Sequence, residues 1–407
     1  MTIPDPPADR AVRGTPGYRR ITRALFVAGL TTFAAMYGTQ ALLPELSDDF
    51  GVSPAVSAMS VSLTTGMIAV AIIPLAVISE RVGRTRVIVW SSIVFTLIGL
   101  LLPISPDLTT LLIGRAVQGV ALAGVPAVAM AYLADEIDPR ALGEAMGRYV
   151  AGTTLGGLLG RILPAIVLDF SGWRWALAAL AVVTALLTGY LVVRLPSSAH
   201  FVAHPMSVRL AMTNLAGHLR DWRLTCLFGS AFVLMGGFVS AYNYLGYRLL
   251  AEPFDLSEAV VGAVFLLYLA GTFSAAAAGR WADRWGRAPV MAASIGVAVV
   301  GLAVTATDSL VAVIVGMGLF TAGFFGAHSV ASGWVGVIAT DHRAEAASMY
   351  LFAYYLGSSV LGALGGTVYL AAGWTGLVAY VAAGLLVAAL LVTGLAVAGR
   401  RREVGGP

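Results

Sequence analysis

Apolar runs of about eighteen residues or more recur along the whole 407-residue chain. Each run is long enough for a helix to cross a hydrocarbon layer of roughly 30 Å. Hydrophobic residues make up 58% of the chain and charged residues only 11%, whereas about a quarter of an ordinary soluble domain is charged. One soluble core could not hold this excess, so the sequence predicts a polytopic membrane protein and argues against a soluble enzyme.

The apolar runs divide into twelve segments. Backbone polar groups in lipid must pair within their own segment, so we expect helices rather than strands. The fold class predicted is therefore an all-α membrane protein with twelve transmembrane helices. The expected spans are 23–44, 55–79, 86–104, 108–133, 146–168, 172–194, 223–247, 257–279, 288–306, 309–338, 347–371 and 374–398.

The positions of the arginines predict the orientation in the membrane. Twelve spans put both termini on one side, and nearly all arginines outside the spans fall in the loops of that side. Only Arg174 and Arg248 fall in the loops of the opposite face. Basic residues accumulate in cytoplasmic loops, so we expect a multi-pass protein of the bacterial inner membrane with both termini cytoplasmic. The lipid bilayer then accounts for the basic composition, and no nucleic acid is expected as a partner.

A polar connection divides the chain into two halves that resemble each other. A shift of 203 residues aligns Glu80 with Asp283 and Arg84 with Arg287. Repeated six-helix halves with a substrate site at their interface are a known transporter architecture, so we expect two pseudo-symmetric six-helix bundles. The expected divisions are a cytoplasmic arm at 1–22, a first bundle at 23–194, a cytoplasmic connecting loop at 195–222, a second bundle at 223–398 and a cytoplasmic tail at 399–407.

The repeated turns carry a sequence motif, ERVGRTR at 80–86 and GRWADRWGR at 279–287. A carboxylate that ends one helix can pair with arginines across a short loop, and glycine permits the tight reversal. Here the sequence resembles the major facilitator superfamily, whose signature between helices 2 and 3 is GxxxDRxGRR. The first copy departs from it at Ala76, Glu80 and Thr85. In that family the turn latches the cytoplasmic helix ends. The candidate gating residues are Glu80, Arg81, Gly83, Arg84, Gly279, Asp283, Arg284, Gly286 and Arg287.

Two further motifs resemble the drug:proton antiporter (multidrug efflux) branch of this superfamily. RAVQG at 115–119 is similar to its RxxQG pattern, and GTTLGGLLGR at 152–161 is similar to GxxxGPxxGG. Gly157 replaces the family proline and Arg161 replaces the final glycine. Glycines spaced every four residues allow close contact between helices. The candidate packing residues are Gly152, Gly156, Gly157 and Gly160.

Arg115 and Arg161 fall inside apolar segments, each roughly 10 Å from the outer end of its span at about 1.5 Å per residue. Placing an arginine there costs roughly 2.5–3.5 kcal/mol on insertion scales, so each needs a partner or a hydrated cavity. In one interpretation backbone carbonyls, Glu45 or Asp169 satisfy them. In the other they line a cavity, where they hold an anionic group of the substrate or control protonation of a nearby carboxylate.

A proton-coupled transporter needs a group that titrates within the membrane. The carboxylates near the spans, Glu45, Asp107, Asp169 and Asp308, all fall at outer ends. His328 is the alternative, since histidine has an unperturbed pKa of about 6.5. A hydrogen-bonded packing role for this histidine remains the simpler interpretation.

Helical spacing predicts a pocket between the halves. Asn243 in span 7 aligns with Gln40 in span 1 across the repeat, and the resemblance implies that helices 1, 4, 7 and 10 line the cavity. Aromatic walls with a few polar anchors suit an amphiphilic organic molecule, although some of these rings are expected only to pack helices. The candidate substrate and coupling residues are Arg115, Gln118, Arg161, His328, Gln40, Tyr37, Asn243 and Tyr242.

These features predict a monomeric secondary transporter that exports a small amphiphilic compound by alternating access. No GxxxxGK loop occurs, so we expect no nucleotide cofactor and take a proton gradient as the energy source. Cys226 is the only cysteine and no HExxH pattern occurs, so neither a metal site nor a catalytic site is expected. The alternatives are uptake or facilitated passage of a small organic anion, a transporter-like sensor, and an intramembrane enzyme.

Overall fold

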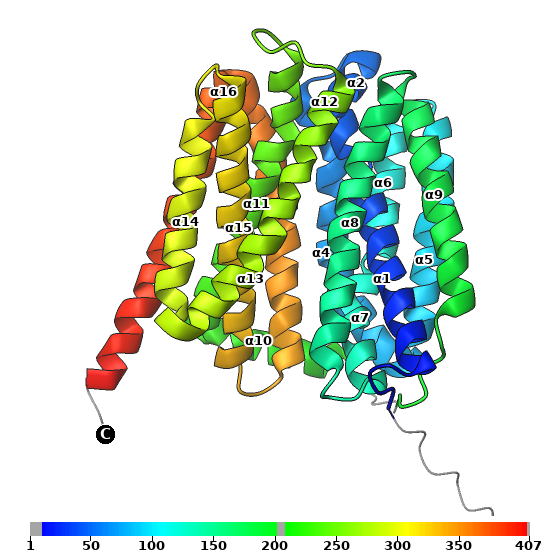
Figure 1. Ribbon diagram of the computed structural model, residues 1–407, viewed down its shortest axis with the longest axis vertical. Coiled ribbons are helices and arrows are strands. Elements are labelled where there is room, and N and C mark those ends of the chain that lie inside the picture. The colour runs from blue at the N-terminus through cyan, green and yellow to red at the C-terminus, as the bar shows by residue number, and fades with distance from the viewer. Residues whose placement is uncertain (1–9, 202–207, 405–407) are drawn as a thin grey trace, which may run out of the picture.

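The structure is a computed structural model of the chain and describes residues 10–201 and 208–404. In this part, eleven helices are long and apolar enough to cross a membrane. The last of them, α16 (Arg343–Val404), contains Gly373 in a non-helical conformation (φ 60°, ψ −157°). The chain reverses there (Figure 1), so α16 supplies two crossings. The predicted all-α membrane fold is thus confirmed.

The helices of the first half run from the N-terminus to residue 194. They are α1 (Pro16–Tyr37), η1 (Gln40–Leu42), α2 (Leu43–Phe50), α3 (Pro54–Ser57), α4 (Met59–Val82), α5 (Arg84–Leu101), η2 (Leu102–Ile104), α6 (Leu108–Leu122), α7 (Gly124–Glu136), α8 (Leu142–Leu168) and α9 (Trp173–Arg194).

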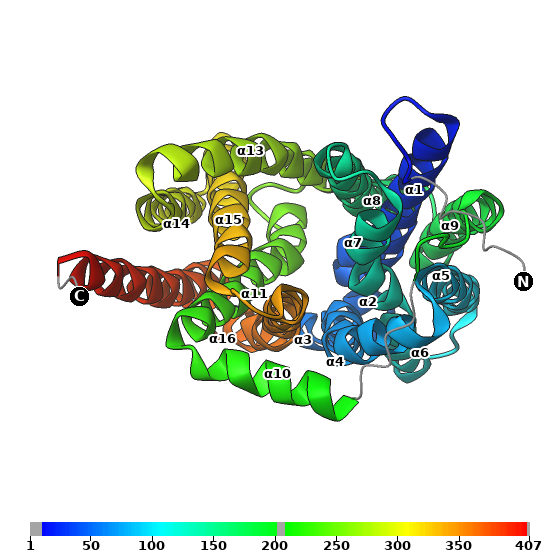
Figure 2. The same ribbon diagram turned by 90° about the horizontal axis from the view of Figure 1, so that it is seen from below.

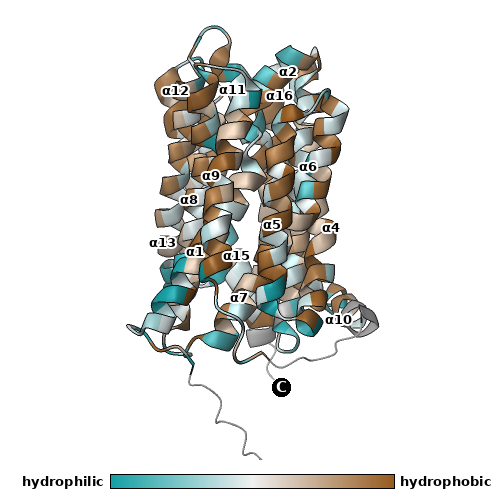
Figure 3. Cartoon of the chain, turned by 90° about the vertical axis from the view of Figure 1, so that its right-hand side faces the viewer, coloured by the Kyte–Doolittle hydropathy of each residue, from teal (hydrophilic) through white to brown (hydrophobic). Residues whose placement is uncertain are grey.

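The second half follows a connecting helix, α10 (Val208–Arg220). Its helices are α11 (Trp222–Leu250), α12 (Glu258–Ala263), η3 (Val264–Leu267), α13 (Tyr268–Trp285), α14 (Arg287–Val304), α15 (Leu310–Ile338) and α16. Figures 1 and 2 show α1–α9 and α11–α16 as two groups of helices standing side by side. Figure 3 shows hydrophobic residues along the middle of the helices and hydrophilic residues gathered mostly at the two ends, as a bilayer requires.

Three regions expected outside the spans contain helix, and in one of them, the tail 399–407, α16 continues to Val404. The first helix begins at Pro16, inside the expected arm 1–22, because Thr15 accepts a hydrogen bond from the backbone N–H of Tyr18 and proline suits the first helical turn. The expected connecting loop 195–222 contains α10, whose sequence spaces apolar residues at a helical period. The first nine residues of the arm and the last three of the tail lie outside the described residues.

Helix α10 marks one end of the molecule. It packs against α11, α16 and α4 and lies across the lower face in Figures 1 and 2. Helix α1 begins and α16 ends at this same end (Figure 1). We call it the α10 end, and we call the opposite end, where α2 and α12 lie, the α12 end.

Glycines bring α8 into close contact with α1. A methyl group added at any of three positions would overlap a backbone carbonyl of α1, so only glycine permits this separation of the two helices. The three are Gly152, Gly156 and Gly160. Gly157 faces another way, since an added methyl group there would lie 3.1 Å from Nη1 of Arg161. This packing positions Arg161 on the last turns of α8 beside α1.

Candidate functional site between the two bundles

Arg115 lies inside the first bundle and only 1% of it is exposed. Its Nε donates to the Ser60 carbonyl (3.0 Å), and its Nη2 donates to the Met36 carbonyl (2.5 Å). Its Nη1 donates to the Ala35 carbonyl (2.8 Å) and to Oε1 of Gln118 (2.6 Å). Backbone carbonyls and one amide therefore satisfy the charge, as the first interpretation of the buried arginines expects. The structure places Arg115 among α1, α4 and α6, away from the junction of the bundles.

Gln118 belongs to the same network. Besides accepting from Arg115, it donates from Nε2 to the Phe95 carbonyl of α5 (2.9 Å). The Thr64 hydroxyl of α4 donates to the Arg115 carbonyl (3.2 Å). The RAVQG motif thus joins four helices of the first bundle, and its two polar side chains are occupied with each other and with the backbone.

Arg161, by contrast, lies at the junction of the bundles. It is also only 1% exposed. Its Nε donates to Oε1 of Gln40 (2.6 Å) and its Nη1 to the Gly157 carbonyl of its own helix (2.7 Å). No carboxylate pairs with it anywhere in the described part of the chain. Its charge is therefore held without a counter-ion.

Three aromatic rings surround the Arg161 guanidinium. Its central carbon lies 3.9 Å from the ring centre of Tyr37, 4.5 Å from that of Tyr268 and 5.2 Å from that of Phe265. Ring faces attract a cation, and more strongly where water is excluded. Tyr37 comes from the first bundle, whereas Phe265 and Tyr268 come from the second. We call these three rings and Arg161 the arginine cage.

Gln40 and Asn243 join the cage to the second bundle. Nε2 of Gln40 donates to Oδ1 of Asn243 (2.7 Å), and both side chains are buried. A continuous path of hydrogen bonds therefore runs from Arg161 through Gln40 to Asn243. Nδ2 of Asn243 is buried and makes no hydrogen bond with any described residue.

Tyr242 supplies the adjoining wall of the second bundle. Its hydroxyl hydrogen-bonds to the Thr321 hydroxyl of α15 (2.7 Å). Its ring centre lies 5.5 Å from that of Phe265 and 4.8 Å from that of Tyr268. Of the residues expected to line the pocket, the structure thus brings together Tyr37, Gln40, Arg161, Tyr242 and Asn243.

The α12 end is closed above these residues. The Tyr247 hydroxyl of α11 donates to the Leu43 carbonyl (2.7 Å) and lies 2.6 Å from each of the Ser47 and Ser57 hydroxyls. The hollow beside Gln40, which Tyr242 also lines, has a volume of about 10 Å³. That is room for about one water molecule, so this hollow admits no organic compound in this conformation.

His328 lies elsewhere, within the second bundle. Its Nδ1 is 2.9 Å from the Tyr350 hydroxyl, and its ring packs against Tyr354 (4.8 Å between ring centres) and Phe324 (5.9 Å). The side chain is half-buried. Among the described residues, no direct hydrogen bond or ring contact joins it to the arginine cage, although ring contacts through Phe324 and Phe238 lead to Tyr268.

The two repeated turns differ in their contacts. Arg84 forms ion pairs with Glu80 (3.0 Å) and with Asp135 at the end of α7. In the second copy, neither Asp283 nor Arg287 forms an ion pair with a described residue. Both turns need a glycine with positive φ, which is 99° in the first copy and 88° in the second.

The remaining gating candidates lie at the same two turns. Arg81, Arg284 and Gly286 are exposed at the α10 end, and Gly83 and Gly279 are half-buried there.

Sequence reasoning missed four residues of these sites: Asp135, Tyr247, Phe265 and Tyr268. Asp135 ends a span directly before a loop, so its position beside the arginine-rich turn was open to inference. Phe265 and Tyr268 carry no polar pattern that separates them from ordinary packing rings.

The matching family and relatives agree with this architecture. The family model of the Major Facilitator Superfamily matches residues 25–245 and 226–406. The chain belongs to the major facilitator superfamily. It is 43% identical over 386 residues to the inner membrane transport protein YnfM of Escherichia coli, covering 94% of this chain and 92% of that protein. It is 39% identical over 376 residues to the MFS-type transporter YybF of Bacillus subtilis, covering 92% and 93%.

Solved structures of the superfamily share the fold. A nucleoside transporter, NupG, superimposes with a TM-score of 0.75 at 14% identity, covering 92% of this chain and 99% of that one. A bacterial homologue of the human lysosomal transporter Spinster gives a TM-score of 0.72 at 15% identity, covering 95% and 96%. The superfamily resemblance seen in the sequence is confirmed. The chain is a multi-pass membrane transporter, and its relatives are transporters rather than enzymes.

Proposed function

We propose that this transporter exports a small amphiphilic organic compound in exchange for protons, by alternating access around the arginine cage. The observation that carries the proposal is the path of hydrogen bonds from Arg161 through Gln40 to Asn243, which crosses the junction of the bundles. Substrate sites in repeat-built transporters lie at such a junction. Aromatic walls with a few polar anchors suit an amphiphilic compound.

Alternating access requires contacts that hold one end closed and then break. The Tyr247 hydrogen bonds to Leu43 and Ser47 join the two bundles at the α12 end. In the proposed cycle they break together with the bond between Gln40 and Asn243, and the bundles then rock to close the α10 end. The ion pairs of Arg84 with Glu80 and Asp135 keep the first turn rigid while its bundle moves.

The proposed proton carrier is His328. The sequence places no carboxylate deep within a span, and histidine is the intramembrane candidate whose unperturbed pKa, about 6.5, is nearest to neutrality. The half-buried His328 ring bonds to the Tyr350 hydroxyl, a contact between α15 and α16. A change in its protonation would alter that contact. Each charge that crosses gains about 2.3 kcal/mol per 100 mV of membrane potential, which is enough to drive export.

The proposed location is the bacterial inner membrane, with the α10 end and both termini in the cytoplasm and the protein working as a monomer. The arginine distribution supports this orientation, and the relative YnfM is named an inner membrane transport protein. Export is favoured by the RAVQG and GTTLGGLLGR motifs, which resemble the drug:proton antiporter branch.

A second candidate is uptake of a small organic anion. It is favoured by Arg161, whose buried charge has no carboxylate partner among the residues that the structure describes. Both candidates use the same cage and differ in the direction of net movement and the sign of proton coupling.

Proteoliposomes that contain a pH-sensitive dye test the proposal against a panel of amphiphilic compounds. Export by exchange predicts that at least one compound drives protons out as it enters the vesicle, whereas uptake with protons would acidify the lumen. Thr188→Val serves as the control protein, because it removes a buried hydrogen bond (2.8 Å to Thr96) inside the first bundle and leaves the arginine cage unchanged. Compounds that bind without any movement would indicate a sensor and contradict the proposal.

A further inference from the structure

We infer that the transported compound carries a planar anionic group, such as a carboxylate, which binds Arg161 inside the arginine cage. This inference rests on the proposed transport function. It names the chemistry of the cargo and separates Arg161 from Arg115, the other buried arginine.

The first step is the unused donor capacity of Arg161. A guanidinium presents N–H groups from all three of its nitrogens in one plane. Hydrogen bonds to Gln40 and Gly157 use Nε and Nη1. The hydroxyls of Tyr37 and Tyr268 interact with the guanidinium as well, but no hydrogen bond of good geometry joins Nη2 to a described residue. At Arg115, by contrast, all three nitrogens donate to protein oxygens. Arg161 is therefore the buried arginine that can accept another partner.

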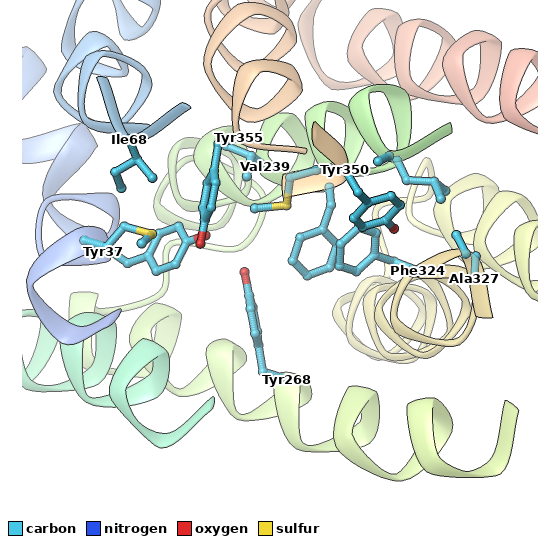
Figure 4. Packing of buried hydrophobic residues seen from close by; sticks show 14 of the residues in the cluster. Tyr37, Ile68, Val239, Tyr268, Phe324, Ala327, Tyr350 and Tyr355 are labelled. Atoms are coloured by element: carbon cyan, nitrogen blue, oxygen red, sulfur yellow. The ribbon is translucent and has the colours of Figure 1, made fainter. Parts of the chain in front are cut away.

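The second step is that other donors gather nearby without an acceptor. Nδ2 of Asn243 and the hydroxyl of Tyr268 are buried and make no hydrogen bond with a described residue. The side chains of Tyr37, Tyr268 and Tyr355 point their hydroxyl ends toward one another (Figure 4), and they come from α1, α13 and α16. Buried donors without acceptors are costly, so the site favours a ligand that only accepts hydrogen bonds. A carboxylate is such a group.

The third step is the shape of the site. Tyr37, Phe265 and Tyr268 present their rings to the guanidinium, and Tyr242 packs on two of these rings. Planar carboxylates bind a guanidinium edge through two parallel hydrogen bonds. Once the bundles part, rings around that edge would pack against a flat apolar body better than against a hydrated one. The cargo class is therefore a monocarboxylate with a small flat apolar body.

The test uses three probes of one shape: benzoate, benzamide and benzylammonium. Each is added to the purified full-length protein in detergent, and the shift of the thermal unfolding midpoint is measured. We expect benzoate to raise the midpoint in a saturable way and the other two to leave it unchanged. In Arg161→Gln the benzoate shift should be lost, and in Arg161→Lys, which keeps the charge but not the planar fork, it should be reduced.

Arg174→Ala is the matched control. Arg174 also lies over an aromatic ring, 4.2 Å from the Trp173 ring centre, but it is exposed at the α12 end. This variant should keep the full benzoate shift. If Arg161→Gln does not fold, loss of the shift in Arg161→Lys with a normal elution volume carries the same test. A benzoate shift that persists in both Arg161 variants would overturn the inference, as would equal shifts from all three probes or none from any.

A transport measurement distinguishes failure of this inference from failure of the proposed function. In proteoliposomes, transport of neutral or cationic compounds but no anion would overturn the inference and leave the transport proposal standing. Benzoate binding that depends on Arg161, with no flux of any compound, would instead contradict the transport proposal.

Discussion

Gln40 and Asn243 stand at equivalent positions of the internal repeat, 203 residues apart, and hydrogen-bond to each other directly (2.7 Å). The pseudo-twofold axis of the molecule therefore passes close to this bond. Both side chains are buried, so the bond is shielded from water and from competing partners. A contact between equivalent residues on the axis is well placed to report any rocking of one bundle against the other.

The first prediction concerns this bond. Gln40→Ala and Asn243→Ala should each favour opening of the α12 end by about 1 kcal/mol, a typical net value for one hydrogen bond. Both substitutions remove this bond, and Gln40→Ala also removes the bond from Arg161, so the double variant should add little to Gln40→Ala. Proton movement in proteoliposomes and labelling of a cysteine placed near Tyr247 measure the effects. Fully additive effects of the two substitutions would contradict this account.

The second prediction concerns Arg115. Arg115→Ala should destabilise the first bundle by at least about 2 kcal/mol, because it leaves buried carbonyls and Gln118 without their charged donor. The unfolding midpoint in detergent measures this loss. Arg174→Ala, on the exposed surface, should change stability by less than about 0.5 kcal/mol. Equal midpoints for Arg115→Ala and the native protein would show that the network is not structural.

The third prediction concerns the proton carrier. His328→Gln keeps a hydrogen-bonding side chain near Tyr350 but removes the titratable ring. Exchange of labelled cargo between the two sides should continue in this variant, whereas cargo-driven proton movement should be lost. Tyr350→Phe removes the bond and keeps the histidine, so its coupling should shift in pH dependence rather than vanish. Normal proton movement in His328→Gln would exclude His328 as the carrier.

The fourth prediction concerns the two repeated turns. Asp135→Asn removes one of the two ion pairs of Arg84, and we expect it to slow transport several-fold. Asp283→Asn, in the copy without an ion pair among the described residues, should have a smaller effect in this conformation. Initial transport rates of the two variants at matched protein levels measure the difference. A larger loss in Asp283→Asn would assign the latch to the second copy.

The sequence alone predicted the fold more completely than it predicted the candidate site. Span length and the repeat predicted the helices and the equivalence of Gln40 and Asn243, because both depend on periodic patterns in the sequence. The direct hydrogen bond between these two side chains is seen only in the structure. The sequence could not predict that Arg115 lies inside the first bundle and Arg161 at the junction, since both are arginines at similar depth in their spans. What separates them is the direction each side chain takes from its helix. Tyr268 was missed for a related reason: its part in the cage depends on how the bundles pack, which no local pattern shows.

The central claim is that the two bundles rock about the cage, opening one end as the other closes. Distance measurements between pairs of spin labels in nanodiscs test it most directly, in a Cys226→Ser background. One pair, at Asp48 and Ala306, lies at the α12 end, and the other, at Arg140 and Thr340, lies at the α10 end; all four positions are exposed. In Asn243→Ala the first distance should lengthen and the second should shorten. If both distances stay unchanged in this variant and between acidic and alkaline buffer, the alternating-access account is contradicted.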